Sequence, residues 1–166
     1  LGFKSDFILS LCELIMGSRN GIEAEEKSVI DRCLPIVYQK YFENPVPENM
    51  PVLGDLYQCL REQHNSRADD LATAMEIYVT GSLSYLNHRT NVDLNNRMVC
   101  YNTSKLGQGL KKLVMSNVQK HIWQRTAVNR YAGITTRIFL DEFHLLLKEP
   151  QTAAYTAEIY KRFRKW

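Results

Sequence analysis

The stretch that decides the fold is Thr136-Arg137-Ile138-Phe139-Leu140-Asp141-Glu142, a short strand-forming run that ends at two adjacent carboxylates. Ahead of it, residues 109–131 repeat apolar side chains at helical spacing, and Gly133 follows as a stop. Earlier still, Arg97-Met98-Val99-Cys100-Tyr101 is a second apolar run between polar turn residues. A strand, a long helix and another strand predict a β-α-β unit with a parallel pair of strands.

The first half of the chain predicts only helices. Apolar residues recur three and four apart over residues 7–15, 29–41, 53–60 and 71–78, and a proline-rich loop over residues 44–51 separates the second group from the third. Pro35 predicts a kink or a restart inside the second group. Tyr155, Ile159, Phe163 and Trp166 give a final helix its apolar face. The expected fold class is therefore α/β and predominantly helical, with an all-helical lobe over 1–88 and a strand-containing domain over 89–166.

Composition is that of an ordinary globular protein, with 45% hydrophobic and 23% charged residues. Charge is distributed unevenly. Residues 1–88 carry 7 Lys and Arg against 13 Asp and Glu, and residues 89–166 carry 14 against 5. The basic half could face phosphates, but lysines on solvated helix faces give the same pattern, and both interpretations stay open.

Four cysteines, Cys12, Cys33, Cys59 and Cys100, are spread without a C-x-x-C pair. Three of them fall within helical patterns, which favours buried free thiols in a reducing cytosol. The early apolar stretch is interrupted by Glu13 and does not resemble a signal peptide. No apolar run approaches the roughly 18 residues that a membrane-spanning helix needs. The first residue is Leu1 rather than Met, and the last residues form a dense basic run. We therefore expect the chain to be part of a longer protein.

The two carboxylates carry the chemistry. A buried strand that ends at Asp141 and Glu142 can hold both beside a nucleotide, where Asp141 would hold Mg2+ through its water shell and Glu142 would activate the attacking water. An ordinary strand end with a solvated acidic turn has the same sequence, and that alternative stays open. His144 is close enough in sequence to support the carboxylates, and the absence of a second ligand at metal spacing favours a hydrogen-bonding histidine over a zinc ligand.

A phosphate-binding loop of the form G-x-x-x-x-G-K-[ST] does not occur in the sequence. The nearest stretch, Gly107-Gln108-Gly109-Leu110-Lys111-Lys112, is too short and lacks the hydroxyl that would bind magnesium. We therefore expect the chain alone to be inactive as an ATPase.

Taken together, several blocks of sequence resemble the large conjugative-transfer ATPase of type IV secretion systems, the VirB-four type within the FtsK/HerA-like P-loop motors. The blocks, in order, are Leu11-Cys12-Glu13, Ile30-Asp31-Arg32-Cys33, Leu53-Gly54-Asp55-Leu56-Tyr57, Asn87-His88-Arg89-Thr90-Asn91-Val92, Phe139-Leu140-Asp141-Glu142-Phe143-His144-Leu145-Leu146-Leu147 and Ile159-Tyr160-Lys161-Arg162-Phe163-Arg164-Lys165-Trp166.

This resemblance implies a partial RecA-like core with a Walker B strand and an all-helical insertion, with ATP and Mg2+ as cofactors. It also implies a hexamer at the inner face of the cytoplasmic membrane, contacts with secretion-channel and coupling proteins, and possible contact with DNA. Arg162, Arg164 and Lys165 could reach a phosphate of the neighbouring subunit, although the same residues could simply solvate the outer face of the last helix.

The leading functional prediction is an ATPase that energises conjugative DNA transfer or type IV secretion. The alternative is a non-catalytic helical module that binds partner proteins of such a complex, with a structural acidic turn. Direct DNA binding by the basic half is a third hypothesis, which predicts an affinity that falls steeply with salt.

Overall fold

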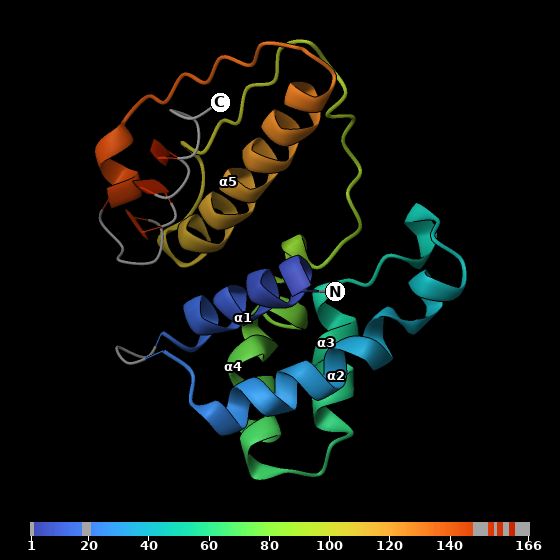
Figure 1. Cartoon of the computed structure of the whole chain (residues 1–166). Helices are drawn as coiled ribbons and strands as arrows, with labels where there is room; N and C mark the ends of the chain where they lie inside the picture. Colours follow the sequence, from blue (N-terminus) through green and yellow to red (C-terminus); the bar gives the residue numbers. More distant parts are fainter. Residues whose placement is uncertain (1, 18–20, 148–152, 155, 158–159, 162–166) are drawn as a thin grey trace. The chain divides into compact units, whose positions relative to one another are not determined.

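The computed structural model describes residues 2–17, 21–147, 153–154, 156–157 and 160–161 (Figure 1). The chain forms two compact units, an N-terminal unit, Leu1–Val99, and a C-terminal unit, Cys100–Trp166. All regular secondary structure among the described residues is helical.

The N-terminal unit contains four α-helices and two short 3₁₀ turns. They are α1 (Gly2–Met16), α2 (Ala24–Glu43), η1 (Pro47–Asn49), α3 (Leu53–Arg61), α4 (Ser66–Val79) and η2 (Ser84–Leu86). The four helices confirm the helical segments predicted from apolar spacing. Of the kink or restart predicted at Pro35, the restart does not occur, since α2 runs through this residue as one element.

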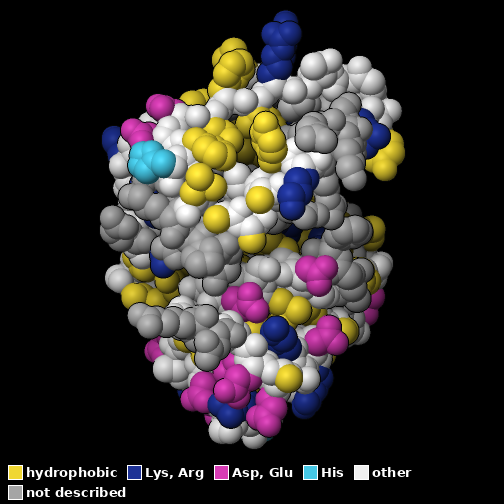
Figure 2. Space-filling model, turned by 60° about the vertical axis from the view of Figure 1, so that its left-hand side comes forward, with side chains coloured by type: hydrophobic (Ala, Val, Ile, Leu, Met, Phe, Trp, Pro, Cys, Tyr) yellow, Lys and Arg dark blue, Asp and Glu magenta, His cyan; other side chains and the backbone are white. Residues whose placement is uncertain are grey.

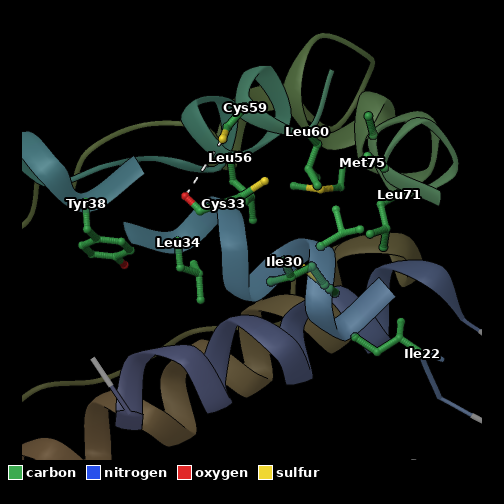
Figure 3. Packing of buried hydrophobic residues seen from close by; sticks show 14 residues of the cluster. Ile22, Ile30, Cys33, Leu34, Tyr38, Leu56, Cys59, Leu60, Leu71 and Met75 are labelled. Carbon is green, nitrogen blue, oxygen red and sulfur yellow. Dashed lines mark hydrogen bonds between the residues drawn. The ribbon is translucent and has the colours of Figure 1, made fainter. Parts of the chain in front are cut away.

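A single core holds the N-terminal unit together (Figure 3). Ile30 and Leu34 of α2, Leu60 of α3, and Leu71 and Met75 of α4 are all fully buried. Within α2 and within α4 these residues lie four positions apart, and on α3 the buried Leu56 lies four positions before Leu60, so one stripe per helix faces the common core. Each buried side chain of this size contributes about 1.5–3 kcal/mol through the apolar surface that it removes from water.

Capping interactions fix the starts of α2 and α4. The Glu23 amide donates to Glu26 Oε2 at 2.7 Å, and Asn65 Oδ1 accepts from the Arg67 amide at 2.9 Å. Arg67 then joins the two helix starts, with its guanidinium 3.2 Å from Glu23 Oε2 and 3.3 Å from Glu25 Oε2. These contacts set where the helices begin and hold those two ends together.

The segment that follows α4 folds back against α3. The Gly54 amide donates to Asn87 Oδ1 at 2.8 Å, and the Asn87 amide group donates to the Val79 carbonyl at 3.4 Å. A Cβ at position 54 would lie 2.9 Å from Asn87 Nδ2, so a larger residue there would require the Asn87 amide group to shift.

The C-terminal unit is built around one long helix, α5 (Gln108–Tyr131), followed by η3 (Phe143–Leu147). Leu110 and Leu113 of α5 are buried, and the buried Gln119 donates to Thr156 Oγ1 at 2.8 Å. Gly133, with φ of 70°, ends the helix as predicted. Of the predicted final helix, described residues such as Ala153, Ala157 and Lys161 are helical, whereas Tyr155, Ile159, Phe163 and Trp166 lie outside the described residues.

The predicted α/β fold class is wrong, since no described residue lies in a strand and no RecA-like core of parallel strands is present in the described chain. Residues 97–101 and 134–140 are rich in strand-forming side chains, but neither segment forms a strand. The physical reason is that β propensity reports how well side chains fit a pleated, half-buried surface, whereas a strand exists only with a hydrogen-bonded neighbour. Neither segment finds that neighbour in the described part of the chain.

Candidate acidic site

The carboxylates Asp141 and Glu142 lie in a turn between an irregular segment, 134–140, and η3 (Figure 1). This segment leaves α5 through Gly133, and the Ile134 amide still donates to the Asn129 carbonyl at 2.8 Å. The Asn129 side chain also donates to Thr136 Oγ1 at 2.8 Å, which ties the start of the segment to the end of α5. The acidic pair therefore follows an apolar stretch, as the sequence predicts, but that stretch is not a strand.

The local backbone of the acidic turn is unusual. Asp141 Oδ1 accepts a hydrogen bond from the Glu142 amide at 2.9 Å, and Glu142 has a positive φ of 52°. Non-glycine residues seldom adopt this left-handed conformation, which costs about 1 kcal/mol or more. Both carboxylates are exposed to solvent.

His144 contacts the second of these carboxylates. His144 Nδ1 lies 3.1 Å from Glu142 Oε2, and each side chain is 63% exposed. An exposed pair of this kind adds little stability. The supporting role predicted for His144 stays a prediction.

The predicted burial of the segment before the acidic pair is wrong. Phe139 is 88% exposed, and Leu140 is also exposed. Other large apolar side chains of the C-terminal unit, Val128, Tyr131, Ile134 and Phe143, are exposed as well. Figure 2 shows hydrophobic side chains gathered at the surface. A surface of this kind on a small unit is typical of a region that binds another polypeptide.

Two carboxylates make an incomplete metal site by themselves. No group of three or more potential ligands (His, Cys, Asp or Glu) is found within the described ranges. The donor set still fits Mg2+, which prefers oxygen ligands and usually keeps several waters while binding one or two carboxylates and substrate phosphates. It does not fit zinc, which needs three or four protein ligands. The predicted phosphate contacts Arg162, Arg164 and Lys165 lie outside the described residues.

Sequence reasoning missed a hydrogen-bonded pair in the C-terminal unit, in which the Tyr101 hydroxyl contacts His121 Nδ1 of α5. The two rings also meet edge to face, with centroids 6.0 Å apart. Burial lowers the pKa of His121, and the nearby positive charge of Arg125 lowers it further. Burial raises the pKa of Tyr101. Tyr101 lies in a loop and His121 lies in α5, 20 positions further on. No periodic pattern in the sequence could therefore have predicted their contact.

The cysteines follow the sequence prediction in part. Cys12, Cys33 and Cys59 are buried free thiols on α1, α2 and α3, whereas Cys100 is exposed. Burial raises the pKa of Cys12 to about 12, with a smaller contribution from the Glu13 carboxylate. The Cys12 thiol therefore behaves as a small hydrophobic group at neutral pH.

Comparison with models of known protein families, with curated proteins and with solved structures gave no match. Across the described ranges, none of the helices combines the length and the apolar character required to cross a lipid bilayer. The case for a function therefore depends on the residues themselves and on their geometry.

Proposed function

We propose that this chain supplies the acidic pair of an ATP-hydrolysing motor that energises conjugative DNA transfer or type IV secretion. One observation carries the proposal: Asp141 and Glu142 are adjacent, exposed and held in a turn directly after an apolar segment. In a helix interior the two carboxylates would be tied to the repeating geometry of the helix. In this turn they are accessible to an ion and to a water molecule at the same time.

The roles of the two residues follow from their chemistry. Asp141 holds Mg2+ through water, and Glu142 orients and activates the water that attacks the terminal phosphate of ATP. When bound, Mg2+ neutralises charge that develops on the phosphates. His144 restricts the Glu142 carboxylate through the 3.1 Å contact. The phosphate-binding loop, absent from these residues, is supplied by another part of the motor, and Arg162, Arg164 and Lys165 are candidates to contact a phosphate of a neighbouring subunit.

In this proposal the motor acts as a hexamer on the cytoplasmic side of the membrane, peripherally attached, with secretion-channel and coupling proteins as partners. DNA is a possible cargo or ligand. The support for these points is the resemblance of the sequence blocks around Asp31, Asp55, His88 and the acidic pair to conjugative ATPases.

The test is ATP hydrolysis by the intact motor with Glu142→Gln, alongside Glu48→Gln as a matched control at an exposed carboxylate on η1. Glu142→Gln should lower turnover by about 10²-fold or more and leave nucleotide binding intact, because the carboxylate acts on the attacking water. Glu48→Gln should leave turnover unchanged. Equal turnover in the two variants would contradict the role of Glu142.

The exposed apolar side chains of the C-terminal unit favour a second candidate, a non-catalytic module that binds partner proteins. Tyr131 and Phe139 are each about nine-tenths exposed, at 93% and 88%. In that case Phe139→Ser would abolish partner binding in the intact complex, while Glu142→Gln would change neither binding nor turnover. The two candidates therefore differ in which of these residues is needed.

A further inference from the structure

Three side chains of the N-terminal unit contact the ammonium group of Lys4 on α1. Lys4 Nζ lies 5.0 Å from the ring centroid of Tyr38 and 4.8 Å from that of Tyr41, both on α2. The ammonium also donates to Met50 Sδ at 3.6 Å, from the residue that follows η1. Both ring distances fall within the roughly 6 Å over which a ring face attracts a cation. We call Tyr38, Tyr41 and Met50 the aromatic cage.

The packing of the helices builds this cage. Tyr38 and Tyr41 lie three positions apart, which places both rings on one face of α2. Phe42 contacts both rings, with centroid distances of 6.0 Å to Tyr38 and 6.2 Å to Tyr41. Tyr38 belongs to the buried cluster of this unit (Figure 3). Lys4, Tyr41 and Met50 are only half-buried. The cage is therefore anchored in the core, while its occupant stays partly accessible to solvent.

The Lys4 ammonium is held by ring faces rather than by a carboxylate. Lys4 takes part in none of the ion pairs among the described residues. A lysine ammonium carries three N–H donors and is strongly hydrated, and the thioether that accepts one of these bonds is a weak acceptor. An ammonium whose N–H groups are replaced by methyl groups needs no acceptors, and aromatic faces are the usual means of recognising it. The cage therefore suits a methylated ammonium better than the side chain that fills it.

We propose that the aromatic cage is a binding site for N-methylated ammonium groups, which Lys4 occupies and closes in its unmethylated form. The ligand is a tertiary or quaternary alkylammonium, carried either by a free molecule or by a methylated lysine side chain. A free ligand has to displace Lys4, which is tethered beside the cage and competes at a high local concentration. This site lies in the N-terminal unit and does not depend on the function proposed for Asp141 and Glu142.

The first experiment titrates tetramethylammonium chloride into the intact chain and follows the tyrosine ring signals by NMR. In Lys4→Ala, which empties the cage, we expect a saturable shift of the Tyr38 and Tyr41 signals. In the wild type the same shift should need about tenfold more ligand or more, because the tethered ammonium competes. Lys40→Ala removes an exposed lysine of α2 and should behave as the wild type. Sodium chloride at equal ionic strength should shift neither signal.

The second experiment uses the wild-type chain and so does not depend on whether Lys4→Ala folds. Reductive methylation with isotope-labelled formaldehyde adds two methyl groups to each lysine and keeps its charge. The ring faces of Tyr38 and Tyr41 shield groups that lie over them, so the dimethyl signal of Lys4 should lie upfield of that of the exposed Lys40. Tyr41→Leu should reduce this displacement, because one of the two rings is removed.

The two experiments separate the two sources of the ligand. Tetramethylammonium binding to Lys4→Ala identifies a site for free alkylammonium ions, and a shielded dimethyl signal of Lys4 identifies a site for a methylated lysine side chain. The proposal is overturned if the tyrosine signals of a folded Lys4→Ala chain do not shift and the dimethyl signals of Lys4 and Lys40 coincide. If Lys4→Ala does not fold, the methylation experiment alone decides.

Discussion

The N-terminal and C-terminal units use their apolar residues in opposite ways. The acidic N-terminal unit packs stripes from α2, α3 and α4 into one core, with Leu60 and Met75 almost inaccessible. The basic C-terminal unit has one long helix and leaves Phe139 and Tyr131 exposed. Several helices with facing stripes bury one another, whereas a single helix covers little of the apolar segments around it. Among the described residues, the acidic turn thus belongs to the unit with fewer buried apolar side chains.

The largest expected difference between the units is the cost of removing an apolar side chain. Leu60→Ala should destabilise the chain by about 2–5 kcal/mol, because it leaves a cavity in a packed core. Phe139→Ala removes a larger side chain that is already in water, and should change stability by less than about 0.5 kcal/mol. Urea unfolding followed by circular dichroism measures both. Comparable losses would mean that Phe139 is buried in solution.

A smaller effect concerns the N-terminal caps of α4 in the N-terminal unit and of α5 in the C-terminal unit. Asn65 caps α4 through its side chain, so Asn65→Ala should cost about 1 kcal/mol. Gly107 occupies the same position in α5 without a side-chain cap, and a Cβ there meets nothing within 4 Å. Gly107→Ser should therefore stabilise α5 by a few tenths of a kcal/mol. Hydrogen exchange in the first turn of each helix tests this pair, and opposite signs are expected.

The smallest effect is a pH dependence confined to the C-terminal unit. Because the pKa of His121 lies below its ordinary value of 6.5, the folded unit binds fewer protons than the unfolded chain between these two values. Stability should rise with pH through that window, level off above about 6.5 and be lost on acidification. Thermal unfolding of His121→Gln across this range should show a flatter profile than the wild type. A matching change in His88→Gln, an exposed histidine of the N-terminal unit, would show that the effect is not specific to His121.

The helices were the predictable part of the fold. Apolar spacing located α2 from Val29 to Tyr41 and α5 from residue 109 to Tyr131, because a helix satisfies its backbone hydrogen bonds within its own segment. The helix does not restart at Pro35. Buried residues before and after it, Leu34 and Tyr38, belong to the same helix α2. The sequence predicted Asp141 and Glu142 at the end of a buried strand, whereas they lie in an exposed turn, and neither the left-handed Glu142 nor the His144 contact was predictable from the sequence.

The sequence by itself determined the helical segments, the uneven charge of the two halves and the adjacency of Asp141 and Glu142. Only the tertiary structure decided that residues 97–101 and 134–140 have no strand partner in the described part of the chain, and that the Cys59 thiol meets the Cys33 carbonyl. The physical reason is the range of the interactions. Helical hydrogen bonds join residues four apart, whereas strand pairing and side-chain contacts depend on neighbours that are distant in the chain and that spacing alone does not identify.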